Sequence, residues 1–166
     1  MMRPIFYFEK LKPFDKWSIG IYLSISLVLF YFFSFSENNQ TKNDIIFGYA
    51  LSTQLLIYPF CYKSLRNLKV YFIWLLIGIM HLYLYFLLKD DPTLNIPRGN
   101  ANFQLKNTLL LLIIYQVLRF LSLKIQKQEF VCPERGLKTD ILGERNPNWL
   151  DITLSFIYFS AVFILD

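Results

Sequence analysis

The stretch VYFIWLLIGIMHLYLYFLL, Val70 to Leu88, contains no charged residue and decides the fold class. At 1.5 Å per residue, a helix over this stretch is about 29 Å long, close to the roughly 30 Å hydrocarbon thickness of a bilayer. The rest of the sequence agrees, because 55% of the residues are hydrophobic and only 17% are charged. That composition is too apolar for a soluble domain of this size. The sequence therefore predicts an all-α integral membrane protein.

Three more apolar runs have nearly the same length, and a fifth is shorter. The uncharged part of the fifth run, from Ile152 to Leu165, covers about 21 Å as a helix. We expect a short fifth span there, with a helix lying in the membrane interface as the alternative. Residues 17–166 are thus predicted to form one transmembrane helical domain, a bundle of five helices or of four plus one interfacial helix. The expected spans are 17–35, 45–62, 70–88, 105–123 and 150–165.

Basic residues are unevenly divided between the two sides of these spans. Twelve lysines and arginines lie in residues 1–16 and in the second and fourth linkers, whereas four lie around the first and third linkers. Because basic loops stay in the cytoplasm during insertion, we predict a cytoplasmic N-terminus and, with five spans, a C-terminus outside. Richness in Ile, Phe, Tyr, Asn and Lys indicates an AT-rich bacterial genome. The expected location is the bacterial cytoplasmic (inner) membrane, as a multi-pass protein.

The N-terminal segment, residues 1–16, interleaves aromatic and aliphatic side chains with lysines. This pattern predicts a basic aromatic segment that lies in the headgroup region. The net charge of +5 follows from the loop asymmetry, so it gives no reason to expect nucleic acid as a partner. The expected partners are the lipid bilayer and other membrane protein subunits.

Four polar side chains inside the spans are the candidate functional residues. His81 is the one histidine of the chain, and Gln54 lies at nearly the same depth in the second span. Because a buried polar side chain needs a partner, we predict that these two face each other. Gln116 and Arg119 share one side of the fourth span, and Arg119 is near enough to the inner end for its side chain to reach the headgroups. The candidate intramembrane polar cluster is Gln54, His81, Gln116 and Arg119.

No motif in the sequence identifies a reaction. Nucleophile-elbow, metalloprotease and nucleotide-binding loop patterns are missing. The sequence has two cysteines, Cys61 and Cys132, and one histidine, all far apart in sequence. A zinc site needs three or four ligands, so a zinc site is not expected. We therefore expect no catalytic, cofactor-binding or metal-binding residues, and both cysteines as reduced thiols.

Three function classes remain open. The first is a non-catalytic polytopic subunit that packs against and stabilises a larger membrane protein complex. The missing catalytic motifs, the aromatic-rich spans and the long linkers 89–104 and 124–149 favour it. The second is a small transporter or channel component with a polar route through Gln54, His81 and Gln116. We rank the subunit above the transporter, because the first four spans hold no acidic residue of the kind that coupled carriers use.

The third class is an intramembrane enzyme that acts on a lipid-linked substrate. In that mechanism His81 would be the base and Arg119 would hold a phosphate. The two residues are expected on different sides of the bilayer midplane, about 10 Å apart in depth. This class therefore ranks last.

Overall fold

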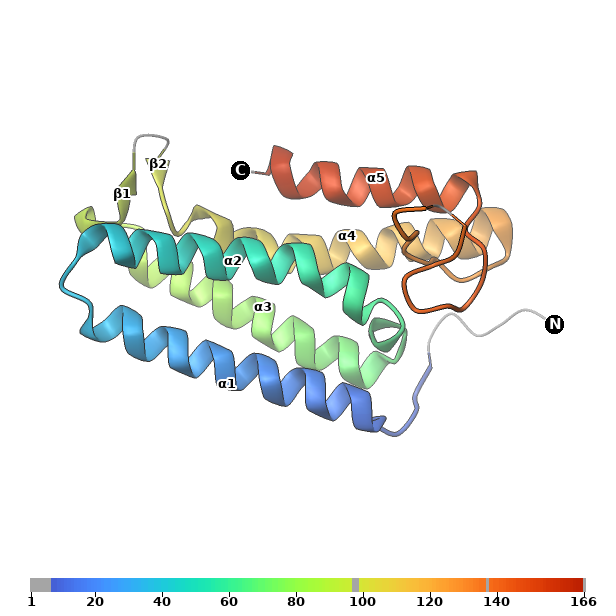
Figure 1. Ribbon diagram of the computed structural model, residues 1–166, viewed down its shortest axis with the longest axis horizontal. Helices are drawn as coiled ribbons and strands as arrows, with labels where there is room; N and C mark the ends of the chain where they lie inside the picture. Colours follow the sequence, from blue (N-terminus) through green and yellow to red (C-terminus); the bar gives the residue numbers. More distant parts are fainter. Residues whose placement is uncertain (1–6, 97–98, 137, 166) are drawn as a thin grey trace.

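The computed structural model describes residues 7–96, 99–136 and 138–165, and it shows a bundle of α-helices (Figure 1). The helices are α1 (Pro13–Phe35), α2 (Asn39–Cys61), α3 (Leu68–Leu88), α4 (Phe103–Gln126) and α5 (Trp149–Ile164). The predicted all-helical fold with five helices is confirmed. Short elements join them: η1 (Ser64–Arg66) between α2 and α3, and η2 (Pro92–Leu94) with the two-residue strands β1 (Asn95–Ile96) and β2 (Gly99–Asn100) between α3 and α4.

Four of the helices, α1 to α4, are long and apolar enough to cross a membrane, with 21 to 24 residues each. This length and composition indicate a multi-pass membrane protein. The fifth helix is apolar but has only 16 residues, so a full crossing by α5 stays a prediction. Several helices begin earlier than the apolar runs because polar residues cap them. Asn38 and Asn67 each accept a hydrogen bond from the first turn of the helix that follows.

The centre of the bundle is α4, which packs against α2, α3 and α5. Gly78 lets α3 approach α4 closely, because a Cβ atom there would lie 3.2 Å from the Cα atom of Leu109. Aromatic rings fill the core beside it: the centroid of Tyr58 lies 4.7 Å from that of Tyr158 and 5.1 Å from that of Phe130. Shape and ring contacts, rather than burial from water, hold helices together in lipid.

The first helix is peripheral. It packs mainly against α2, and Asp15 is the one buried residue among those the structure describes in α1. Figure 1 shows α1 and α5 at opposite edges of the bundle, with the other three helices between them. Most of the surface of α1 is therefore available to lipid or to another chain.

The predicted basic linkers lie together at one end of the bundle, which we call the loop end: residues 7–12, 62–67 and 127–148. Tyr7 pairs with Asn67 in a parallel bridge, and the Tyr7 carbonyl accepts the Leu68 N–H at 2.9 Å. The opposite end, which we call the hairpin end, holds the α1–α2 turn and the α3–α4 connection (Figure 1). Part of the predicted interfacial segment, residues 1–6, lies outside the described residues. The orientation of the two ends in a membrane stays a prediction.

Candidate functional site

The loop end is built around an ion pair that a chain reversal brings together. Helix α4 ends at Gln126, and the next residue, Lys127, adopts a left-handed conformation with φ 58° and turns the chain back. This reversal places Glu129 against Arg119, which lies ten residues earlier in α4. The Nε and Nη2 atoms of Arg119 donate to the two carboxylate oxygens of Glu129, each at 2.8 Å. The two side chains are only 2% and 3% exposed.

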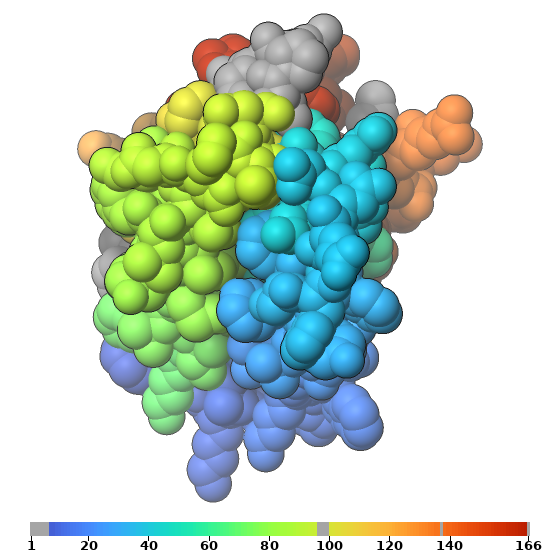
Figure 2. All heavy atoms as spheres, turned by 90° about the vertical axis from the view of Figure 1, so that its left-hand side faces the viewer, coloured from blue at the N-terminus to red at the C-terminus, as the bar shows by residue number. Residues whose placement is uncertain are grey.

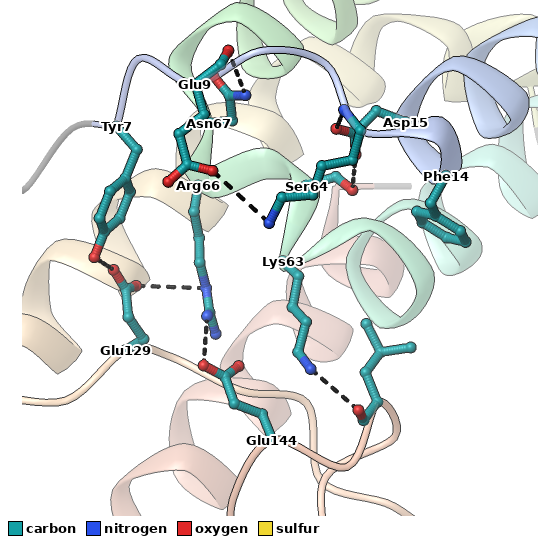
Figure 3. A pocket seen from close by; sticks show the side chains of 12 residues that line it. Tyr7, Glu9, Phe14, Asp15, Lys63, Ser64, Arg66, Asn67, Glu129 and Glu144 are labelled. Atoms are coloured by element: carbon teal, nitrogen blue, oxygen red, sulfur yellow. Dashed lines mark hydrogen bonds and ion pairs between the residues drawn. The ribbon is translucent and has the colours of Figure 1, made fainter.

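Two further groups bind the same carboxylate from other segments (Figure 3). The Tyr7 hydroxyl donates to Glu129 at 3.0 Å, and Arg66 Nε lies 3.5 Å from Glu129 Oε2. Burial opposes ionisation of Glu129, but the hydrogen bonds and charge of Arg119, together with the charge of Arg66, lower the pKa of its carboxyl below the ordinary value. Glu129 is therefore ionised and joins three segments of the loop end.

Arg66 extends this network to the loop 127–148. Its Nη1 atom donates to Glu144 at 2.8 Å and its Nη2 atom to the Phe130 carbonyl at 2.9 Å. Burial favours loss of its proton, yet the bond to Glu144 and the nearby acidic groups outweigh this and raise the pKa of Arg66. The guanidinium thus stays charged and binds the loop at two points.

The far part of the loop is closed by two carboxylates. Asp140 accepts the Tyr62 hydroxyl and the backbone N–H groups of Leu142, Glu144 and Arg145. Burial raises the pKa of Asp140, but these hydrogen bonds lower it by a larger amount, so the pKa lies below its ordinary value. Arg145 Nη2 donates to Asp151 and to the Glu129 carbonyl, each at 2.8 Å. Loop 127–148 is therefore an ordered cap over the bundle.

A pocket of about 590 Å³ lies beside this cap (Figure 3). Charges of both signs line it, and the structure gives them partners: Lys63 Nζ donates to the Leu142 carbonyl at 3.1 Å, and Asp15 accepts the Ser64 hydroxyl at 2.5 Å. Within the described residues, no three His, Cys, Asp or Glu side chains are placed to hold a metal ion. Glu9 and Lys12 also line the pocket, and their exposed side chains form an ion pair at 3.8 Å.

A second polar group lies halfway along the bundle, and we call it the hydroxyl–imidazole cluster: Tyr22, Ser26, Tyr49, Thr53, His81 and Thr108. His81 Nε2 lies 2.9 Å from the Tyr22 hydroxyl and 2.8 Å from the Tyr49 hydroxyl. The two hydroxyls are 2.8 Å apart, and Thr108 Oγ1 lies 3.0 Å from His81 Nδ1. This fully buried imidazole therefore connects α1, α2, α3 and α4.

The predicted pairing of His81 with Gln54 is wrong. Gln54 Nε2 donates instead to the Gln104 carbonyl of α4 at 2.5 Å. Equal depth in the bilayer does not fix the direction of a side chain around its helix, and α4 provides the nearer partner. Among the described residues, no hydrogen bond joins His81 to Gln54 or to Gln116.

The other two predicted residues do lie together. Arg119 Nη1 donates to Gln116 Oε1 at 3.4 Å, and Gln116 Nε2 donates to the Leu65 carbonyl at 2.9 Å. The expectation that Arg119 reaches the headgroups is wrong, because its side chain is only 2% exposed and is held by Glu129. Both residues of α4 bond to segments of the loop end.

Sequence reasoning missed the residues that complete both polar groups. Tyr22 with Ser26, and Tyr49 with Thr53, are hydroxyl pairs at helical i, i+4 spacing inside apolar runs. This signal was available, but it is weak in a chain with eleven tyrosines. Glu129 had no local signal, since its partners come from three separate segments.

The fold and the site define a multi-pass helical membrane protein with an ordered cap at one end. No family model matches the sequence, and the searches of curated proteins and of solved structures found no match either.

Proposed function

We propose that the protein is a non-catalytic polytopic subunit that packs against and stabilises a larger membrane protein complex in the bacterial cytoplasmic membrane. The observation that carries this proposal is that three helix glycines have different surroundings. Gly78 packs directly against α4, whereas a Cβ atom at Gly20 or at Gly48 would meet no other atom within 4 Å.

Each of the two open glycines has a small neighbour one turn later. Gly20 precedes Ser24 on α1, Gly48 precedes Ser52 on α2, and all four residues are exposed. Small residues four apart let helices approach closely in lipid, where packing and not water drives association. The chain uses a close glycine contact internally at Gly78 and leaves two pairs of small residues on its surface, which supports a neighbouring helix as their partner.

The aromatic surface of α1 supports the same proposal. Large exposed side chains cover both ends of this peripheral helix, among them Phe14, Trp17, Phe30, Tyr31, Phe32 and Phe35. Aromatic residues are enriched in the contact surfaces of protein complexes. The loop end adds a surface of fixed shape, because its charges are used to hold loop 127–148 in place.

Co-purification with matched variants tests the proposal. The protein is purified from its native membrane in mild detergent, and the associated proteins are quantified by mass spectrometry. We expect a partner at fixed stoichiometry that Gly20→Leu or Gly48→Leu removes while the helical content of the protein is unchanged. The matched control is Ile25→Phe, which enlarges another exposed face of α1.

Two results would contradict the proposal. One is a partner yield that neither glycine substitution lowers. The other is a stable partner-free protein that moves a solute in liposomes and loses this activity in His81→Ala, which would favour the transporter.

The proposed orientation has its own test. Single cysteines at Asn39, Asn95 and Lys138 are labelled from either side of the membrane, and the native Cys61 and Cys132 are buried. With the N-terminus in the cytoplasm, Asn39 and Asn95 should react from the outside and Lys138 from the inside. Labelling of Lys138 from the outside would overturn the orientation.

A further inference from the structure

An apolar slot of about 580 Å³ lies between α1, α2 and α3 in the half of the bundle next to the hairpin end. Side chains from α1 between Leu23 and Ser34 form one wall, and side chains from α3 between Met80 and Leu88 form the other. Ile45 and Tyr49 of α2 close the back. Figure 2 looks onto the hairpin end, where the blue-to-cyan α1–α2 turn stands beside the yellow-green α3–α4 connection.

The slot has the length of one leaflet. Leu23 and Ser34 are about 16 Å apart along the axis of α1, at 1.5 Å per residue. Half of a hydrocarbon core of roughly 30 Å is about 15 Å. The hydroxyl–imidazole cluster borders the inner part of the slot, because Ser26 and Tyr49 line the slot and also bond to each other at 2.9 Å. The lining ends at Leu23 of α1 and Met80 of α3, near the middle of both helices. An apolar chain in the slot would therefore run from the hairpin end to the middle of the bundle and stop there.

A lysine of α2 lies beside the slot at the hairpin end. Lys42 Nζ lies 5.8 Å from the ring centroid of Phe33, and Phe33 lines the slot. Asp91 is near Lys42: hydrogen bonds from Thr93 lower the pKa of the Asp91 carboxyl most, and the charge of Lys42 lowers it further. Asp91 caps η2, and η2 packs against α2, the helix that contains Lys42. An ammonium and a carboxylate at the same end of the bundle match the phosphate and the amine of a zwitterionic headgroup.

We propose that this slot binds one acyl chain of a zwitterionic phospholipid from the leaflet at the hairpin end, with the lipid phosphate at Lys42. The walls are apolar over about one leaflet depth, polar side chains border the inner part of the slot, and Lys42 offers a positive charge beside Phe33. The walls include none of Gly20, Ser24, Gly48 and Ser52, the small residues assigned to the proposed partner subunit, and they share Phe30 with the aromatic surface of α1.

Native mass spectrometry of the full chain tests the slot. The protein is reconstituted with equal amounts of phosphatidylethanolamine and phosphatidylglycerol and then released into mild detergent. We expect one retained phosphatidylethanolamine per chain. Met80→Trp should lower the lipid-bound fraction by about tenfold, because the indole fills space that the acyl chain needs.

The matched control is Ile79→Trp. Ile79 neighbours Met80, is 52% exposed against 46% for Met80, and does not line the slot. If Met80→Trp loses helical content, Leu27→Trp replaces it, with Val28→Trp as the control on the same helix. Equal lipid retention in a slot variant and its control would overturn the proposal, and so would retention of no lipid by the unaltered chain.

A second arm tests the headgroup. Lys42→Gln should lower retention of phosphatidylethanolamine, whereas Lys106→Gln, which removes the same charge from α4 at the hairpin end, should not. Equal retention in these two variants, or preferential retention of phosphatidylglycerol, would overturn the assignment of the phosphate to Lys42.

Discussion

Arg119 and Glu129 form a two-bond ion pair, Nε to Oε2 and Nη2 to Oε1, that joins α4 to the loop which follows it. Paired N–H donors of a guanidinium match the two oxygens of a carboxylate, so this is the strong geometry for such a pair. The pair is almost completely buried. Removal of either partner would leave the other charge buried without its partner, which is costly.

Glu129→Gln should destabilise the protein strongly. The substitution leaves Arg119 without its carboxylate partner and also weakens the attraction of Arg66. Loss of one partner of a buried ion pair costs about 3 to 5 kcal/mol. Chemical or thermal unfolding in detergent measures this, with the exposed Glu37→Gln as the control. Equal stability of the two variants would show that Glu129 does not hold the loop end.

Stability should also fall in acid. Glu129 and Asp140 have folded pKa values below their ordinary values of 4.5 and 3.8. A carboxylate with a lowered folded pKa stabilises the fold above its unfolded pKa, and this contribution is lost as the pH falls through the folded pKa. We expect the unfolding midpoint to drop below about pH 4. The double variant Glu129→Gln, Asp140→Asn should flatten that drop; an unchanged drop would contradict the assignment.

His81→Phe should loosen α1 from the bundle. The imidazole contacts hydroxyls of Tyr22, Tyr49 and Thr108, which lie on three other helices. Hydrogen bonds between helices in membranes contribute about 0.6 kcal/mol on average and about 1.7 kcal/mol at most. A loss of about 1 to 2 kcal/mol is therefore expected in an unfolding titration. Tyr49→Phe combined with His81→Phe should be less than additive, and full additivity would argue against the direct contact.

Gly78→Ala and Gly48→Ala should have opposite effects. A methyl group at Gly78 would press on the α4 backbone at Leu109, and overpacking of this kind costs about 1 to 3 kcal/mol. Gly48 has open space, so alanine there should stabilise α2 by up to about 1 kcal/mol in the partner-free protein. Unfolding of both variants in the same detergent decides the matter. Destabilisation by Gly48→Ala would mean that its surface packs within the chain.

Cys132 should be unreactive in the folded protein. Burial raises the pKa of its thiol to about 12, with a smaller rise from Asp140 that the Tyr58 hydrogen bond opposes. Thiol reagents attack the thiolate, so maleimide labelling at pH 8 should be slow and should become complete after denaturation in SDS. A cysteine at the exposed Lys138 is the control. Rapid labelling of native Cys132 would show that loop 127–148 opens readily.

The helices were predictable because hydrocarbon thickness and helix rise fix the length of an uncharged run. All four long spans match helices, and α3 ends at Leu88 as expected. The starts differ by a few residues because capping groups such as Asn38 and Asn67 extend a helix into polar sequence. These short-range effects involve neighbouring residues, which makes them readable from sequence.

The candidate site was less predictable because its contacts join distant segments. Depth placed His81 and Gln54 at the same height, but the direction of each side chain depends on how α4 sits between its neighbours. The partner of Arg119 could not be found from α4 alone, since Glu129 reaches it only after the left-handed turn at Lys127. The sequence marks which groups need partners, and the packing of the helices decides which partners they obtain.

The order of synthesis gives the loop end a further consequence. Arg66 emerges from the ribosome 64 residues before Phe130, whose carbonyl it binds, and Arg119 emerges ten residues before Glu129. Until residues 129–151 have been made, both guanidinium groups must stay hydrated at the membrane surface. We therefore expect this end to assemble after insertion: the first four helices can enter a bilayer in sequence, but the arginines become buried only when residues 129–151 arrive.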